Sequence, residues 1–481
     1  MPRIVVDGVA VEAEIGQSVI EAARAHGIDI PHFCWHPALS VAGSCRVCIV
    51  EIEGRGLDIA CNLPATDGIV VSTDSPAVRE RRRQMLELTL LNHPVDCGIC
   101  DKAGECALQD YHYAHNGAPS GSAEPKVRAT KFHALSERIV LDNERCILCS
   151  RCVRFTHEIS KSHGLGIRHR GDASLVRETG DGAFARDPYS DNVVDICPVG
   201  ALLPRPSLYR SRVWYLQPTR SVCPGCARGC PVQLWHRKPE WRLHALDPRE
   251  NRAIVRVTPL DDGRPEGPWI CNKARDLAAI FERPRALQPM LHGRSVTLDE
   301  AIEAARDVIE RGTRRVAFVS SWGSNEELAA FRDAFEGRFR TFVKRDHRPL
   351  PGEPVEDDFL IRADKNPNTS AAAALFGRPD EGDAPSLLDG PPDVVLVWGE
   401  GFDIGDVPPG ARTIVLDAYD HAGHAHADVF VPLSIQTERS GHYTNFQGIV
   451  RAFDACFRRP ETVADAQALF ARLGTRTAVA A

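Results

Sequence analysis

The sequence predicts a multidomain protein of α+β and α/β class, with small cysteine-rich domains first and an α/β domain last. Two observations support this prediction. Fifteen of the sixteen cysteines lie within the first 271 residues, in tight groups. Beyond residue 289, apolar strand patterns alternate with helix patterns, which is typical of a parallel sheet covered by helices. A chain of 481 residues is long enough to bury several cores.

The first expected domain, over 1–78, is rich in strands. Apolar runs on both sides of Asp7-Gly8 predict a hairpin, because this dipeptide favours a tight turn between short strands. Ser18 and Glu21 have the spacing of a capping box and predict the start of a short helix. Further strands are predicted over 48–52 and 69–71. Strands around one helix, with cysteines on a loop beside it, resemble the β-grasp ferredoxin fold.

Four further domains are expected, over 79–125, 126–215, 216–288 and 289–481. A helix is predicted from Pro76 to about Asn92, since proline favours the first helical position. Its basic run, Arg79 and 81–83, is expected to be a solvated face, because a single run without interleaved aromatic residues is not typical of a nucleic-acid surface. The Gly-, Ser- and Pro-rich stretch 116–125 predicts a linker.

The α/β domain begins with a helix that Thr297 and Glu300 should cap. A second helix is expected from Glu326. The predicted strands cover 316–319, 393–397 and 413–416. Because the strands alternate with helices, we expect them to form a parallel sheet. The segment 345–392 is rich in Pro, Gly and Asp and is expected to be an insertion or a long surface loop.

The formal net charge is −7, which gives the whole chain no general electrostatic reason to bind nucleic acid. No apolar run is long enough to cross a bilayer, and the N-terminus lacks a signal-peptide pattern. We therefore expect a cytoplasmic protein whose membrane association would come through partner subunits. In that reducing compartment, tightly grouped cysteines are more often metal ligands than disulfides.

The grouped cysteines and one histidine form four sets of four candidate ligands. Cys-x-x-Cys turns supply two thiolates from one loop, and the other ligands can be distant in sequence. The remaining cysteine, Cys456, is expected to be a buried thiol without a ligand role. The four sets are Cys34, Cys45, Cys48 and Cys61; His93, Cys97, Cys100 and Cys106; Cys146, Cys149, Cys152 and Cys197; and Cys223, Cys226, Cys230 and Cys271.

The Cys34 set is interpreted as a [2Fe-2S] site because strand patterns surround it, although ten residues separate its first two cysteines where a plant-type ferredoxin has four. A structural zinc site is the alternative. His93 could be an ordinary loop histidine. Beside three cysteines that lack a fourth partner it is expected to be a ligand, either of a [4Fe-4S] cluster or of zinc in a Cys3His site. A neutral imidazole would leave the cluster less negative and alter its potential.

The last two sets each contain three closely spaced cysteines. In the Cys146 set the gaps are two residues each, and Cys197 is followed by proline, which is a strong [4Fe-4S] signal. The triple that begins at Cys223 also favours [4Fe-4S]. Its distant partner, Cys271, is the member that sequence spacing constrains least.

In order and spacing, the four sets resemble the large iron–sulfur subunit of respiratory complex I, NADH–quinone oxidoreductase, which is the G subunit in bacteria. The resemblance is specific over residues 1–290. The remainder is similar, more weakly, to the molybdopterin-oxidoreductase domain that this family carries in inactive form, but it is short for a full domain of that kind. The resemblance implies one [2Fe-2S] and three [4Fe-4S] clusters, with the Cys223 cluster set apart from the main electron path. No cysteine between Cys271 and Cys456 could bind molybdenum. A serine or aspartate ligand stays open, but no molybdopterin is expected.

The resemblance implies an electron relay from a flavin-containing NADH-oxidising subunit towards quinone. The implied partners are that subunit and the other hydrophilic subunits, with the membrane arm contacted indirectly, on the cytoplasmic side of the inner (plasma) membrane. No nucleic acid, catalytic residue or NAD site of its own is expected, since no Gly-x-Gly-x-x-Gly fingerprint is present. Two alternatives remain: the electron-transfer subunit of a soluble NAD-linked hydrogenase or formate dehydrogenase, and a zinc-stabilised binding or scaffold protein.

Overall fold

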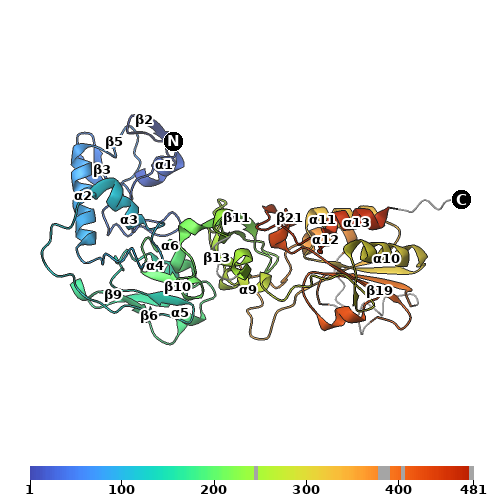
Figure 1. The fold of residues 1–481 in the computed structure, drawn as a ribbon. Helices are drawn as coiled ribbons and strands as arrows, with labels where there is room; N and C mark the ends of the chain where they lie inside the picture. The colour runs from blue at the N-terminus through green and yellow to red at the C-terminus, as the bar shows by residue number, and fades with distance from the viewer. Residues whose placement is uncertain (243–247, 378–390, 402–406, 476–481) are drawn as a thin grey trace. The chain divides into compact units, whose positions relative to one another are not determined.

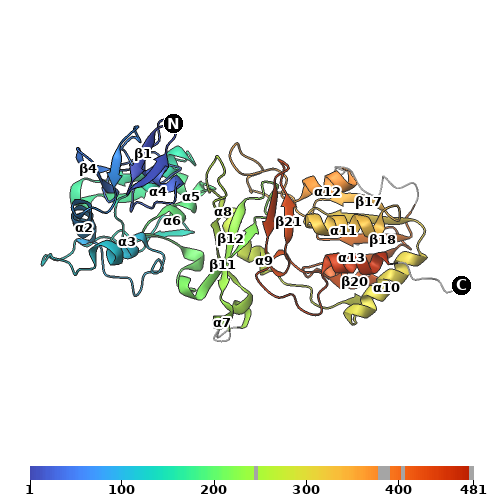
Figure 2. The ribbon, with the colours of Figure 1, turned by 90° about the horizontal axis from the view of Figure 1, so that it is seen from above.

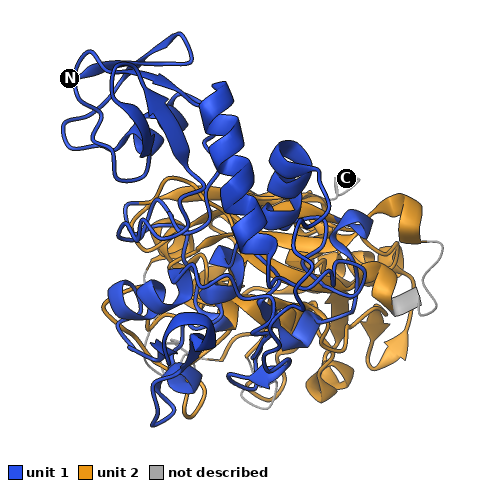
Figure 3. Ribbon diagram, turned by 90° about the vertical axis from the view of Figure 1, so that its left-hand side faces the viewer, with its two compact units in different colours: residues 1–216, 265–272 blue, residues 217–264, 273–481 orange. Residues whose placement is uncertain are grey.

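The chain divides into two compact units, which Figure 3 colours separately. The computed structural model describes residues 1–242, 248–377, 391–401 and 407–475. Unit 1 consists of residues 1–216 and 265–272, and unit 2 consists of residues 217–264 and 273–481. The short segment 265–272, which carries Cys271, therefore belongs to unit 1 although the chain on both its sides belongs to unit 2.

Unit 1 begins with a five-stranded sheet that packs against helix α1 (Val19–Ala25) (Figure 1). The strand order is β2-β1-β5-β3-β4, with β1 and β5 parallel. The predicted hairpin is confirmed, and Asp7 and Gly8 at its turn have φ of 50° and 82°. The capping box at Ser18 is confirmed too, since its backbone N–H donates to Glu21 at 2.8 Å. The strands are β1 (Arg3–Val6), β2 (Val9–Glu12), β3 (Ile49–Ile52), β4 (Gly56–Ile59) and β5 (Val70–Ser72).

Helix α2 (Pro76–Leu90) begins at the predicted proline, but its basic run is not a solvated face throughout. Arg82 is only 2% exposed. Its guanidinium donates to the carbonyl oxygens of Ile49 at 3.1 Å and Thr73 at 2.9 Å. The prediction of a solvated face is therefore wrong for Arg82. Its guanidinium supplies hydrogen bonds to carbonyls at the edge of the sheet, and the sequence of the helix alone does not show that these acceptors lie beside it.

The rest of unit 1 consists of short elements joined by long loops. Two small antiparallel sheets are present, with strand orders β10-β7-β6 and β8-β9. The elements are α3 (Ala107–Tyr111), β6 (His133–Ala134), β7 (Ile139–Leu141), α4 (Arg151–Glu158), β8 (Leu165–Arg168), β9 (Leu175–Glu178), α5 (Ala183–Arg186), α6 (Asn192–Ile196) and β10 (Leu202–Pro204).

Unit 2 begins with a three-stranded antiparallel sheet and continues into the predicted parallel sheet (Figure 2). The smaller sheet has the order β11-β12-β13. The larger one has the order β15-β14-β20-β19-β18-β16-β17, and its strands from β20 to β17 are parallel. The strands are β11 (Leu216–Val222), β12 (Pro231–Arg237), β13 (Ile254–Pro259), β14 (Met290–Leu291), β15 (Arg294–Ser295), β16 (Arg315–Ser320), β17 (Arg340–Lys344), β18 (Val394–Trp398), β19 (Arg412–Asp417), β20 (Val429–Pro432) and the hairpin β21 (Gly441–Thr444) and β22 (Val450–Phe453).

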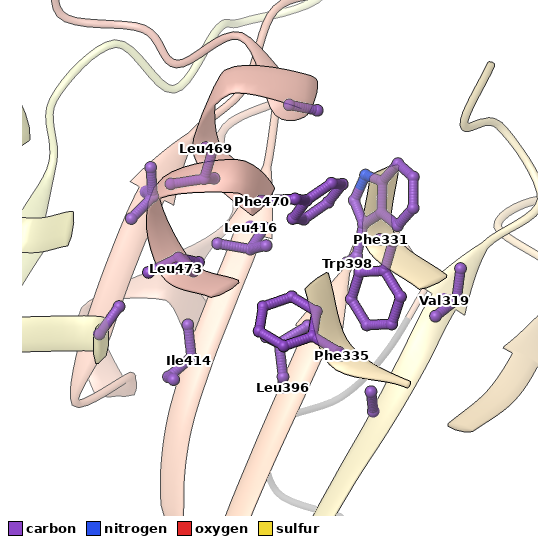
Figure 4. Close-up of a cluster of buried hydrophobic side chains, with 14 of the residues drawn as sticks. Val319, Phe331, Phe335, Leu396, Trp398, Ile414, Leu416, Leu469, Phe470 and Leu473 are labelled. Atoms are coloured by element: carbon purple, nitrogen blue, oxygen red, sulfur yellow. The ribbon is translucent and has the colours of Figure 1, made fainter. Parts of the chain in front are cut away.

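Within the described residues, four helices cover one face of the parallel sheet. They bury an aromatic cluster against it, with Phe331, Phe335 and Phe470 around Trp398 (Figure 4). A smaller apolar cluster occupies the opposite face. Burial on both faces explains why the strands are continuously apolar rather than alternating. The helices are α10 (Leu298–Arg311), α11 (Asn325–Phe335), α12 (Thr369–Phe376) and α13 (Ala466–Gly474), while α7 (Pro239–Arg242), α8 (Asn272–Arg275) and α9 (Leu277–Phe281) lie before them in the chain.

The segment 345–392 is not a loop throughout. Helix α12 lies within it, and Lys365 is buried, with its ammonium donating to the carbonyls of Pro354, Val355 and Arg362 at 2.9 Å each. The loop prediction is wrong for 369–376, because the alanine-rich sequence there forms a helix directly after the proline-rich stretch. Residues 378–390, also part of this prediction, lie outside the described residues. In the part of the chain that is described, no helix has the length and apolar character needed to span a membrane.

Candidate metal centres

The thiols of the Cys34 set interact in two pairs beside helix α1. Cys34, Cys48 and Cys61 are each 1% exposed. Cys34 interacts with Cys45, and Cys48 with Cys61. The contact with Cys45 lowers the pKa of Cys34 to about 5. The backbone N–H groups of Phe33 and Cys34 both donate to Cys45 Sγ at 3.4 Å, an arrangement that stabilises negative charge on the sulfur.

The His93 set lies on the loops between α2 and α3. Cys100 and Cys106 are buried and close enough to interact electrostatically, and Cys100 interacts with the exposed Cys97. Burial, reinforced by Arg145, lowers the pKa of His93 to about 4 and keeps its imidazole neutral. His93 Nδ1 is buried without a hydrogen-bond partner. Since buried polar atoms are normally satisfied, a neutral imidazole with an unused nitrogen fits a ligand role.

The Cys146 set lines one apolar cavity in unit 1. All four cysteines contribute to its wall, together with Leu141 and other apolar side chains. Leu148 and Ser150, between the cysteines, have φ of 51° and 60°, so the loop curls tightly. Burial raises the pKa of Cys146 to about 12 and that of Cys149 to about 11. Buried thiols of this kind ionise readily only beside compensating positive charge, as in a metal site.

The Cys223 set is distributed over both units. Cys223, Cys226 and Cys230 lie on the loop from β11 to β12 in unit 2, whereas Cys271 belongs to unit 1. The Cys223 N–H donates to the Cys230 carbonyl at 2.8 Å and closes the loop. Burial raises the pKa of Cys230 to about 11, and Arg264 lies beside it. Three of the four predicted ligands are therefore brought onto one loop.

Within the described ranges, no three His, Cys, Asp or Glu side chains are grouped so that they could hold a metal ion. The ligand sets therefore stay predictions. Cys456, the cysteine outside the sets, is buried as expected, and burial raises its pKa to about 12.

Sequence reasoning missed two buried arginines beside the candidate ligands, Arg145 and Arg151, which are 1% and 9% exposed. Each immediately precedes a cysteine of the Cys146 set. The position of each arginine next to a cysteine of the set could have indicated its burial. A buried cation is costly unless an anionic group, such as a thiolate or a cluster, lies beside it.

A second cavity lies at the carboxyl ends of the parallel strands in unit 2, with Ser320, Asp346 and Asp417 in its wall. This edge is where open α/β sheets bind ligands. Three cations at or near this cavity contact carboxylates. These ion pairs are Lys344 with Asp346, Arg283 with Glu400 and Arg439 with Glu327.

Three family models match separate parts of unit 1. Residues 2–76 match a 2Fe-2S iron–sulfur cluster binding domain. Residues 82–118 match the NADH-ubiquinone oxidoreductase-G iron–sulfur binding region. Residues 136–203 match the ferredoxin-like domain of NADH-quinone oxidoreductase subunit 3. The Cys34, His93 and Cys146 sets each lie inside one of these matches.

Curated relatives extend the similarity. The G 2 subunit of NADH-quinone oxidoreductase from Rhizobium meliloti is 42% identical over 71% of this chain and 39% of its own length. The G subunit from Streptomyces coelicolor is 36% identical over 62% of this chain and 34% of its own. The mitochondrial NADH dehydrogenase [ubiquinone] iron–sulfur protein 1 of Solanum tuberosum is 35% identical over 60% and 38%. The chain thus spans well under half the length of these relatives. Among solved structures, a chain of an NAD+-reducing [NiFe]-hydrogenase is 33% identical over 44% of this chain and 91% of its own, with a TM-score of 0.39.

Proposed function

We propose that this chain, a relative of the NADH-quinone oxidoreductase G subunits that carries their iron–sulfur binding domains, is an electron-transfer subunit of such an oxidoreductase. It accepts electrons from the flavin-containing NADH-oxidising subunit and passes them to another hydrophilic subunit, towards quinone. The observation that carries the proposal is the coincidence of three ligand sets with three matched iron–sulfur domains in one compact unit.

The proposed cofactors are one [2Fe-2S] cluster on the Cys34 set and a [4Fe-4S] cluster on each of the His93, Cys146 and Cys223 sets, the last completed by Cys271. Bound clusters supply one-electron redox chemistry. The residues of the chain hold these groups in place. N–H groups of Phe33 and Cys34 point at Cys45 Sγ, and apolar walls exclude water from the Cys146 set. A neutral His93 makes its site less negative than four thiolates would.

The C-terminal α/β region, 289–481, is proposed to be a truncated molybdopterin-oxidoreductase-like domain without a working molybdenum centre, used to dock neighbouring subunits. Its parallel sheet and the cavity at the strand ends support the likeness. Lys344, Arg283 and Arg439, near that cavity, are paired with carboxylates, so these three are not free to pair with an anionic cofactor. We propose that domain boundaries lie at residues 78, 125, 215 and 288.

The proposed location is peripheral, on the cytoplasmic side of the inner (plasma) membrane, with attachment through the partner subunits of the complex and the membrane arm contacted indirectly. No nucleic acid is among the proposed partners, in keeping with the net charge of −7.

Metal analysis of anaerobically purified protein tests the cofactors. The protein should be brown and carry about 14 iron atoms per chain if all four sets hold clusters. Colourless protein with stoichiometric zinc would contradict the proposal. Stoichiometric molybdenum or tungsten would contradict the inactive C-terminal domain.

Reduction by NADH tests the relay. The clusters of the purified chain should stay oxidised with NADH alone, because the sequence has no Gly-x-Gly-x-x-Gly nucleotide fingerprint. They should be reduced once the flavin-containing subunit is added. Reduction of an acceptor by the isolated chain with NADH, free of flavoprotein, would count against the relay.

A further inference from the structure

Two buried arginines lie within the Cys146 loop and helix α4, and each connects the Cys146 set to a different neighbouring set. Arg145 directly precedes Cys146, and Arg151 directly precedes Cys152. Both are buried in unit 1. The guanidinium group stays protonated in proteins, so both positions carry a fixed positive charge.

Arg151 connects the Cys146 set to the Cys34 set. Its guanidinium donates to the carbonyl of Ile196 at 3.0 Å, next to Cys197. It also donates to the carbonyl of Trp35, next to Cys34. Its Nε is buried without a hydrogen-bond partner. One cation therefore stands between two groups of candidate ligands.

Helix α4 reinforces this connection one turn later. Arg154 donates to the carbonyls of Cys34 and Cys149, one from each set. The contact is thus made twice by the same helix, which fixes the spacing of the two sites.

Arg145 connects the Cys146 set to the His93 set. The side chains of Cys100 and Arg145 both lie against Gly200, in the loop that follows Cys197. A Cβ atom built on Gly200 would clash with Cys100 Sγ and would lie 3.8 Å from Arg145 Cδ. Arg145 Nη1 is buried without a hydrogen-bond partner. The other nitrogens face Asp96 at 3.1 Å and Asp142 at 3.2 Å, which offset part of the charge.

We propose that Arg145 and Arg151 are positioning residues that set cluster potentials in pairs: Arg151 for the Cys34 and Cys146 sites, and Arg145 for the His93 and Cys146 sites. Each electron added to a cluster makes it more negative, and a buried cation favours that reduced state because the surroundings screen it poorly. Unpartnered N–H groups can also donate to cluster sulfurs, which raises the potential further. The proposal depends on the clusters of the proposed function.

Redox titration followed by electron paramagnetic resonance tests the pairing, in the full chain within its complex. In Arg151→Gln, the ratio of reduced to oxidised cluster at a fixed potential should fall about tenfold at the Cys34 and Cys146 sites, about 59 mV for a one-electron couple. The His93 site should change much less. In Arg145→Gln, the His93 and Cys146 sites should shift and the Cys34 site should not. Arg79→Gln is the control, because Arg79 is exposed and its loss removes one surface charge; none of the three potentials should shift.

Asp142→Asn is the second variant, in case either glutamine variant loses a cluster. Removing this carboxylate leaves more of the Arg145 charge unopposed, so the ratio of reduced to oxidised cluster should rise at the His93 and Cys146 sites only. Equal shifts at all three sites, or none, with iron content retained, would overturn the pairing while leaving the proposed function intact. Absence of clusters from the unaltered chain would instead refute the proposed function.

Discussion

The two units are each stabilised by a different kind of interaction. In unit 2, helices pack an aromatic cluster onto a continuous apolar sheet. In the cysteine-rich part of unit 1, elements are short, and buried charged groups lie among the thiols, including Asp142, Arg145 and Arg151. The comparison indicates that the parallel sheet of unit 2 depends mainly on burial of apolar side chains and should form without bound metal. In unit 1, we expect metal bound at the candidate ligand sites to hold the loops together and to contribute much of the folding free energy.

Iron removal should give the largest difference between the units. Anaerobic chelation with an oxidant is expected to unfold the loops of the Cys146 set, because structural metal sites contribute on the order of 10 kcal/mol and buried thiols and arginines would then face one another uncompensated. Unit 2 should keep its parallel sheet. Hydrogen exchange with peptide resolution would measure this, and full protection of 146–152 in iron-free protein would contradict the comparison.

Phe331→Ala tests the opposite side of the comparison. Phe331 is 0% exposed and stacks on Trp398, so the truncation should reduce the free energy of unfolding of unit 2 by about 3–5 kcal/mol. Iron content of unit 1 should be unchanged. The matched control is Leu350→Ala, at a side chain 69% exposed, and denaturant titration measures both. If both variants lowered the free energy of unfolding equally, the stability of unit 2 could not be attributed to its apolar core.

Arg82→Ala tests whether buried cations, and not only ligands, stabilise unit 1. The change leaves the carbonyls of Ile49 and Thr73 without their charged donor and should cost about 2–3 kcal/mol. Arg81→Ala, at the exposed neighbour, should change the unfolding free energy little. Thermal unfolding of the first domain, monitored through its visible absorption, gives the difference. No difference would show that α2 is held by its apolar side chains alone.

A pH effect on unit 2 is the smallest expected one. Burial lowers the pKa of His236, whose Nε2 lies 2.8 Å from Thr219 Oγ1. Below pH about 6.5 the unfolded chain takes up a proton that the folded unit does not, so stability should fall as the pH falls, by at most about 1.4 kcal/mol per pH unit.

The measurement is the melting temperature of unit 2 between pH 7 and 5.5, with and without His236→Asn. The variant should flatten the pH dependence, whereas His426→Asn, at an exposed histidine, should preserve it. An unchanged slope in His236→Asn would assign the pH dependence to other groups.

Local sequence patterns predicted the local structure well. The Asp7-Gly8 turn, the capping boxes at Ser18 and Thr297, and the parallel sheet are confirmed. These features depend on neighbouring residues: turn dihedrals, backbone N–H groups within three residues, and apolar runs. The spacing of the ligand sets is likewise local, and it predicts cluster sites that metal analysis will test.

Only the tertiary structure decided which distant groups meet. It placed Arg82 under the sheet, assigned the segment with Cys271 to unit 1, and set Arg145 and Arg151 between ligand sets. The physical reason is that a buried arginine goes where acceptors remain unsatisfied after packing. The carbonyls of Ile49, Ile196 and Trp35, which accept from Arg82 and Arg151, lie more than thirty residues away in the sequence. Residue type and spacing predicted the ligands, whereas packing determined which charges lie beside them.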